Sequence, residues 1–102
     1  MRQSNLIGEV LIKWDIQAVQ DYKFFLKNKR IIEKIKKLLE SIEENYSRGI
    51  GKPERLKGYK ERLLYSRRID EKNRLIYEVI QNDDKQVISI TILGLKGHYN
   101  DK

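Results

Sequence analysis

The hydrophobic pattern of this chain changes its period once, near the glycines and the single proline of residues 49–53. Before that segment, apolar residues recur every three or four positions, which is the spacing of an amphipathic helix. After it, apolar and polar residues alternate in segments rich in Ile, Val, Tyr and Thr, which is typical of strands. A chain with its helices first and most of its strands last is predicted to have an α+β fold.

Two helices are predicted in the N-terminal half, after a short apolar strand at residues 10–14. Asp15 can cap the first helix, because its carboxylate can accept hydrogen bonds from the free N–H groups of the first turn. The apolar stripe of this helix is predicted to consist of Ile16, Val19, Tyr22 and either Phe25 or Leu26. The second helix is predicted from Lys29 to about Arg48, with Gly49 as its C-cap.

Three strands are predicted at residues 63–69, 74–81 and 86–95, because the segments between them, DEKN and NDD, are good turn sequences. They are expected to form an antiparallel meander in a twisted sheet. The two helices are expected to cover one face of this sheet and to leave the other face open for function.

A length of 102 residues fits one domain, so residues 1–102 are expected to form a single unit with residues 1–9 as an N-terminal extension. The longest apolar segments are too short or too interrupted to span a membrane or to form a secretory signal. A cytoplasmic protein without a membrane partner is therefore expected.

The positive charge of the chain is concentrated in one segment. The whole chain has 22 Lys and Arg against 15 Asp and Glu, and residues 52–74 hold nine of these cations with four acids. Cations of this kind can simply guard a sheet edge against aggregation. However, Arg67 and Arg68 are adjacent within a predicted strand, so they should point to opposite faces. An arginine on the open face is suited to binding a phosphate, and nucleic acid is the first partner to consider.

Few side chains in this sequence are suited to chemistry. Glu54 is a single acid in the basic segment GKPERLK of residues 51–57, and His98 is the only histidine. A lone histidine is most often solvated. The chain has no cysteine and no acidic cluster, so neither a metal site nor a cofactor is predicted. A glutamate, several strand arginines, one histidine and a neighbouring tyrosine are the components of a metal-independent ribonuclease.

Such an enzyme uses the ribose 2′-OH as its nucleophile. A base takes the proton of this hydroxyl, an acid protonates the departing 5′ oxygen, and cations stabilise the crowded phosphate. Glutamate has a reference pKa of about 4.3 and histidine about 6.5. Near neutral pH a glutamate is therefore available as a base, and a histidine is partly available as an acid.

Four ordered motifs of the chain resemble one known family. They are GKPERLK at residues 51–57, SRRID at 66–70, NRLIYE at 73–78 and GHY at 97–99. In order and separation they are similar to the YoeB/Txe family of bacterial addiction toxins within the RelE-like group, and the resemblance covers about residues 10 to 99.

The resemblance implies a compact fold with a twisted antiparallel sheet, and a ribosome-dependent endoribonuclease that cuts mRNA in the decoding site. It also implies inhibition by a cognate antitoxin of the YefM or Axe type, and often a toxin homodimer. By matched position, it makes Glu54 the general base, His98 the general acid, Arg74 the ligand of the phosphate and Tyr99 an orienting group. Tyr99 could instead simply close the core.

The predicted RNA-binding residues are Lys52, Lys57, Arg67 and Arg68. Lys57 and Arg68 match supporting positions of the family. Which arginine shares a face with Arg74 depends on the connection between the two strands. A plain four-residue turn at residues 70–73 would place Arg67 there, whereas a bulge or a different loop would place Arg68 there.

Two functions from other classes remain open at this stage. A RelE/ParE-type fold could act as a toxin without nuclease activity, by binding a protein target such as a topoisomerase, and would not need the Glu/His pair. The chain could also be an RNA-binding module, which a cleavage assay would distinguish from a nuclease.

Overall fold

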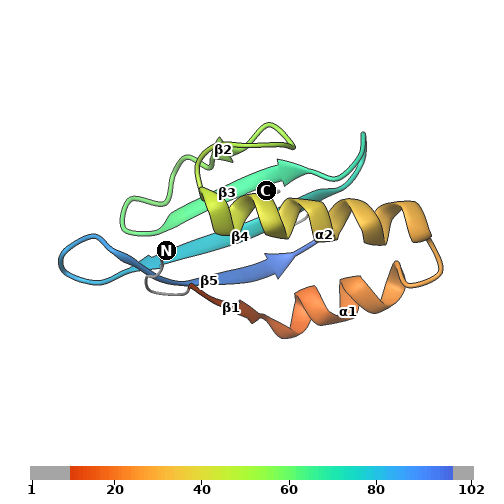
Figure 1. Ribbon diagram of the computed structural model, residues 1–102, viewed down its shortest axis with the longest axis horizontal. Helices are drawn as coiled ribbons and strands as arrows, with labels where there is room; N and C mark the ends of the chain where they lie inside the picture. The colour runs from red at the N-terminus through yellow and green to blue at the C-terminus, as the bar shows by residue number, and fades with distance from the viewer. Residues whose placement is uncertain (1–9, 98–102) are drawn as a thin grey trace.

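The computed structural model describes residues 10–97, and these form two helices and a single sheet. The helices and strands, in chain order, are β1 (Leu11–Trp14), α1 (Ile16–Phe24), α2 (Lys29–Glu44), β2 (Glu54–Arg55), β3 (Leu63–Arg68), β4 (Arg74–Gln81) and β5 (Val87–Gly94). Both helices lie on the same side of the sheet (Figure 1), so the predicted α+β class and its layering are confirmed.

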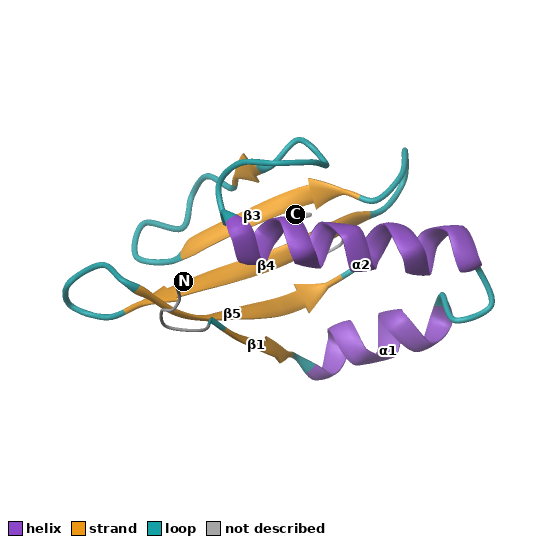
Figure 2. Cartoon of the chain, in the orientation of Figure 1, coloured by secondary structure: helices purple, strands orange, loops and turns teal. Residues whose placement is uncertain are grey.

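The sheet has the strand order β1-β5-β4-β3-β2 (Figure 2). The meander of β3, β4 and β5 is antiparallel, as predicted, and β2 adds an antiparallel edge strand within the basic loop. β1 pairs with β5 in parallel, so the sheet is mixed and not wholly antiparallel. A parallel pair needs a long crossover connection, and the helices and remaining strands supply it.

The first helix begins as predicted, and its buried face differs in part from the prediction. Asp15 is its N-cap, and its Oδ2 accepts a hydrogen bond from the Gln17 N–H at 3.3 Å. Ile16, which was predicted to lie on the apolar stripe, is 69% exposed. Phe25 is buried and Tyr22 packs against the core, as predicted, but the helix also buries Ala18 and Asp21. Asp21 turns inward because its Oδ2 accepts a hydrogen bond from the backbone N–H of Leu95 at 2.8 Å, just past the end of β5.

The second helix presents the predicted apolar face but ends early. Ile35, Leu38 and Ile42 are buried against the sheet. The helix stops at Glu44, because Asn45 is extended and its side chain accepts a hydrogen bond from the Ser47 N–H at 3.0 Å. The prediction of a helix to Arg48 with a Gly49 cap was therefore wrong.

The hydrophobic core lies between the helices and one face of the sheet. On β4 this face carries Leu75, Tyr77 and Val79, and on β5 it carries Ile90 and Ile92. The intervening strand residues point to the other face, where no helix lies among the described elements. Neither α1 nor α2 is long and apolar enough to cross a membrane.

Candidate active site

Glu54 and Arg74 come together on the face of the sheet away from the helices. Glu54 opens β2 and pairs with Ser66 of β3, while Arg74 opens β4. Arg74 Nη1 lies 3.6 Å from Glu54 Oε1 and donates a hydrogen bond to Ser66 Oγ at 3.4 Å. The Glu54 side chain is 70% exposed and that of Arg74 is 37% exposed. A carboxylate and a guanidinium are thus both accessible at one place on the surface.

Arg68 is the arginine that shares this face with Arg74. The two residues are direct cross-strand partners, and Arg68 is exposed. The β3–β4 connection is tighter than a plain four-residue turn, because the N–H groups of Ile69 and Asp70 both donate to the Asn73 carbonyl. This register resolves the question that the sequence left open.

The Asp70 carboxylate stabilises this connection. Its Oδ1 accepts hydrogen bonds from the N–H groups of Lys72 at 2.9 Å and Asn73 at 2.7 Å. Slight burial raises the pKa of Asp70, but the hydrogen bonds from Asn73 and Lys72 outweigh it and hold the pKa below its ordinary value. The ionised carboxylate thus maintains the turn that places Arg68 beside Arg74.

Arg67 points to the opposite side of β3. It is 0% exposed, and its guanidinium donates hydrogen bonds to protein oxygens on the helix side of the sheet. This burial contradicts the prediction that Arg67 contacts RNA.

The remaining predicted residues have different placements. Lys52 and Lys57 are exposed on the two sides of Glu54 in the chain. His98 and Tyr99 lie outside the described residues. The last described residue, Gly97, packs on Arg74: a Cβ at Gly97 would lie 3.4 Å from the Arg74 N atom and 3.5 Å from its Cβ. The described chain therefore ends in contact with the candidate site.

Ser66 and Glu78 are two residues of this face that the sequence interpretation did not include. Ser66 is 1% exposed and underlies the Glu54–Arg74 pair as the acceptor for Arg74. Glu78 accepts two hydrogen bonds from Arg62, at 2.8 and 3.1 Å. Strand alternation could have revealed Ser66, because it lies two positions before Arg68 on the same strand.

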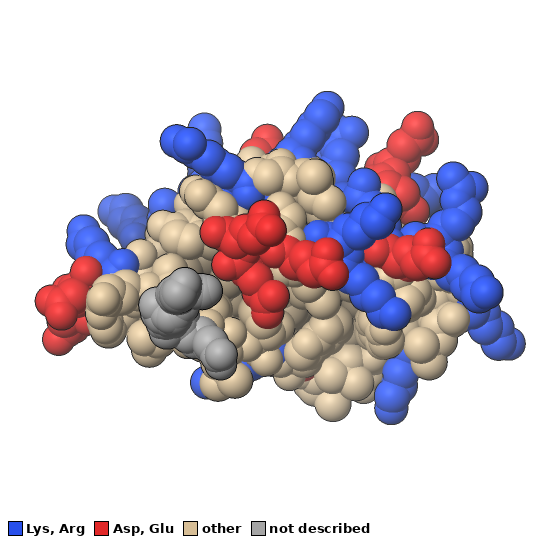
Figure 3. Space-filling view, viewed as in Figure 1, with Lys and Arg blue, Asp and Glu red and all other residues tan. Residues whose placement is uncertain are grey.

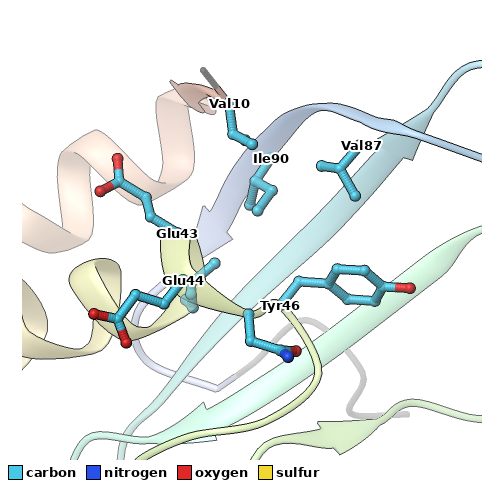
Figure 4. Close-up of a pocket in the computed structure, with 8 residues that line it drawn as sticks. Val10, Glu43, Glu44, Tyr46, Val87 and Ile90 are labelled. Carbon is cyan, nitrogen blue, oxygen red and sulfur yellow. The ribbon is translucent and has the colours of Figure 1, made fainter. Parts of the chain in front are cut away.

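A cavity of about 240 Å³ lies elsewhere, between the end of α2 and the start of β5 (Figure 4). Its lining consists of Val10, Ile42, Glu43, Glu44, Asn45, Tyr46, Val87 and Ile90. No predicted site residue belongs to it. The candidate site is instead an open surface, which suits a polymer better than a small molecule that needs to be enclosed.

Charge is unevenly distributed over the described surface. Seen from the helix side, acidic side chains gather over α2, and basic side chains follow the edge that carries β2 (Figure 3). Within residues 10–97, no three His, Cys, Asp or Glu side chains gather in a group that could hold a metal ion. On the other face of the sheet, the charged groups of the candidate site are the guanidinium groups of Arg68 and Arg74 and the carboxylate of Glu54.

Comparisons with known proteins find similarity to one family. A family model described as the YoeB-like toxin of bacterial type II toxin–antitoxin systems matches residues 14–99. The toxin YoeB of Escherichia coli K12 is 36% identical over 87 residues, which is 84% of this chain and 95% of the relative.

Solved structures give the same family. The YoeB dimer from Staphylococcus aureus has a TM-score of 0.72 at 42% identity and covers 90% of this chain and 100% of that one. A heterotetrameric YoeB–YefM toxin–antitoxin complex from Staphylococcus aureus has a TM-score of 0.68 at 40% identity, with the same coverage.

Proposed function

The chain belongs to the YoeB-like toxins of bacterial type II toxin–antitoxin systems, and we propose that it is a ribosome-dependent, metal-independent endoribonuclease that cuts mRNA in the decoding site. The observation that supports this most is the exposed Glu54–Arg74 pair, with 3.6 Å between Oε1 and Nη1. A single phosphodiester laid over this pair could meet a base at its ribose and a guanidinium at its phosphate.

In the proposed reaction, Glu54 removes the proton of the 2′-OH. The 2′ oxygen forms a bond to phosphorus, the bond from phosphorus to the 5′ oxygen breaks, and His98 protonates that oxygen. The products are a 2′,3′-cyclic phosphate on one fragment and a 5′-hydroxyl on the other. Glu54 then carries the proton that it accepted, and His98 has lost one.

The cations of the open face have the second role in this proposal. Arg74 and Arg68 stabilise the negative charge that grows on the phosphate oxygens, and they supply the positive charge that a metal ion would provide in other nucleases. Lys52 and Lys57 attract the RNA backbone, and Tyr99 orients the phosphate or the ribose. Because Arg74 already contacts Glu54 in the free protein, binding of RNA exchanges part of that ion pair for contacts with phosphate.

An antitoxin is the proposed protein partner. One solved relative is described as a YoeB–YefM complex and another as a YoeB dimer, both from Staphylococcus aureus. By analogy, a YefM-like antitoxin would inhibit this toxin by covering the open face with a segment that folds on binding and supplies acidic groups to the arginines. The toxin would also form a homodimer.

The decisive experiment is cleavage of a translated message that carries one deoxyribose on the 5′ side of the scissile phosphate. Cleavage should stop while binding is hardly weakened, because most of the attraction comes from phosphates and stacking. Primer extension locates the cut in the normal message, and end analysis should find a 5′-hydroxyl on the downstream fragment. Cleavage of the deoxy message at the same bond, or a 5′-phosphate product, would show that water is the nucleophile and refute the mechanism. A toxin that only binds a protein target would cut neither message.

A further inference from the structure

The guanidinium of Arg67 is buried, and each of its five N–H groups has a protein acceptor. Nε donates to the Tyr77 hydroxyl at 3.0 Å. Nη1 donates to Ser41 Oγ at 2.6 Å and to the Ile50 carbonyl at 3.1 Å. Nη2 donates to the carbonyls of Asn45 at 2.7 Å and Arg48 at 2.9 Å. Five is the full donor capacity of arginine, and none of these acceptors is a carboxylate.

The three carbonyls come from one segment, residues 45–50, which leads from the end of α2 towards Glu54. These carbonyls accept hydrogen bonds from Arg67, and helix α2 does not continue through them. The Tyr77 hydroxyl, which accepts from Arg67, donates in turn to the carbonyl of Tyr46 in the same segment. The guanidinium therefore holds three residues of this segment directly and a fourth through the Tyr77 hydroxyl.

Strand β3 also holds Gly51, the residue that follows this segment. The Arg68 N–H donates to the Gly51 carbonyl at 2.7 Å. Gly51 has a φ of +82°, and a Cβ there would lie 2.6 Å from Leu38 Cδ2 and 3.2 Å from the Arg67 Cβ. The backbone thus passes tightly between α2 and Arg67 immediately before the turn to Glu54.

We propose that Arg67 is a positioning residue, which fixes the loop of residues 45–53 and through it the carboxylate of Glu54. This inference rests on the proposed nuclease function. Only three residues separate Ile50 from Glu54, and Pro53 restricts one of them. A shift of the Ile50 carbonyl is therefore passed on to the base, and a displacement of about 1 Å at a reacting group can lower a rate by about 10²-fold.

Lysine cannot replace this arginine. An ammonium group has three donors at one point, whereas the acceptors around Arg67 are arranged for a planar group with five. Arg67→Lys leaves at least two of these oxygens without their donor, and the loop relaxes towards water. The variant keeps a positive side chain, so a change in activity reports geometry more than charge.

The test compares Arg67→Lys with Arg30→Lys, which makes the same exchange at an exposed position of α2. Single-turnover cleavage is measured over a range of ribosome concentrations, at a temperature at which each variant is fully folded by circular dichroism. Arg67→Lys should lower the saturated rate by about 10²-fold and change the half-saturating concentration less than twofold, because Arg68 and Arg74 remain. Arg30→Lys should match the wild type. A merely structural Arg67 would lower the melting temperature and leave the saturated rate of folded protein unchanged, which would overturn the proposal.

A double-mutant comparison separates positioning from general damage. In a Glu54→Gln background, Arg67→Lys should lower the residual rate no further, because the base that it positions is already lost. A further loss of the full 10²-fold would mean that Arg67 acts independently of Glu54 and would refute the proposal.

If Arg67→Lys does not fold, Ser41→Ala replaces it, because that change removes one acceptor of Nη1 and leaves the arginine in place. Ser41→Ala should reduce the saturated rate in the same manner but less strongly, and an unchanged rate would count against the proposal.

The nuclease mechanism and the positioning role of Arg67 can fail separately. Full cleavage by Glu54→Gln would refute the nuclease mechanism, whereas loss in Glu54→Gln with full rates in Arg67→Lys and Ser41→Ala would refute only the positioning role.

Discussion

Arg68 on β3 and Arg74 on β4 lie directly opposite each other on the open face of the sheet. Like charges in direct cross-strand pairs destabilise a sheet, so this pair opposes folding in the absence of an anion. Arg68→Thr should raise the free energy of unfolding by roughly 0.5 kcal/mol and at the same time weaken RNA cleavage.

Denaturant unfolding and primer extension on the same preparation check both effects. Lys13→Thr is the matched control, because Lys13 is an exposed strand cation that lies opposite Thr91 and not opposite another cation. The free energy of unfolding of Lys13→Thr should not exceed that of the wild type. A loss of stability in Arg68→Thr together with unchanged cleavage would contradict the interpretation of this arginine pair.

Glu54→Gln should reduce cleavage to a small residual rate and leave folding unchanged. The side chain is 70% exposed, and an exposed ion pair contributes about 1 kcal/mol or less, whereas the amide cannot accept the proton of the 2′-OH. Thermal unfolding and cleavage are measured together. Glu61→Gln, which changes another exposed acid within residues 52–74, should keep full activity. Equal loss in both variants would indicate that net charge, and not a specific base, governs the reaction.

Gly51→Ala should destabilise the fold more than Gly58→Ala. Both glycines have positive φ, at +82° and +90°, but a Cβ at Gly51 would lie 2.6 Å from Leu38 Cδ2 while a Cβ at Gly58 would meet nothing within 4 Å. Both substitutions therefore strain the backbone, but only the substitution at Gly51 also creates a steric clash. The difference in free energy of unfolding should be roughly 1–3 kcal/mol. Equal effects would show that the Gly51 loop is free to move away from α2.

Unfolding at alkaline pH should reveal the buried Tyr77 hydroxyl. Burial raises the pKa of Tyr77, and the hydrogen bond from Arg67 offsets this only in part. The folded state then holds this proton more tightly than the unfolded state, so its contribution is complete below the unfolded pKa of about 10 and is lost as pH rises above it. Tyr77→Phe should therefore show a shallower decline in free energy of unfolding above about pH 10 than the wild type. An identical decline would mean that Tyr77 ionises equally in both states.

Local sequence signals predicted most of the elements, because strand alternation, turn residues and the Asp15 cap all act within a few residues. The parallel pairing of β1 with β5 could not be read in this way, since it joins segments at opposite ends of the described chain. Ile88 illustrates the same limit. Simple alternation would group it with Ile90 and Ile92, yet it is 49% exposed, because the β4–β5 register is irregular near Ile80 and Gln81.

Arg67 explains the two largest errors of the sequence interpretation. Fully buried arginine is rare, so a basic residue in a strand is normally assigned to the surface. The early end of α2 has the same origin, because the carbonyls of Asn45 and Arg48 bind a guanidinium whose position in the sequence is distant. Glu54, Arg68 and Arg74 were easier to group, because the motifs that carry them could be matched to a known family. Their mutual geometry still depended on the tight β3–β4 connection.

The pairing of β1 with β5 also sets the order in which the sheet can be completed. A chain is synthesised from its N-terminus at about 5–20 residues per second, and β1 has no neighbour among the described strands until β5 has been made. Contacts between such distant segments form late and slowly. Cotranslational folding therefore cannot finish this sheet early, and the toxin completes its sheet only after β5 has been made.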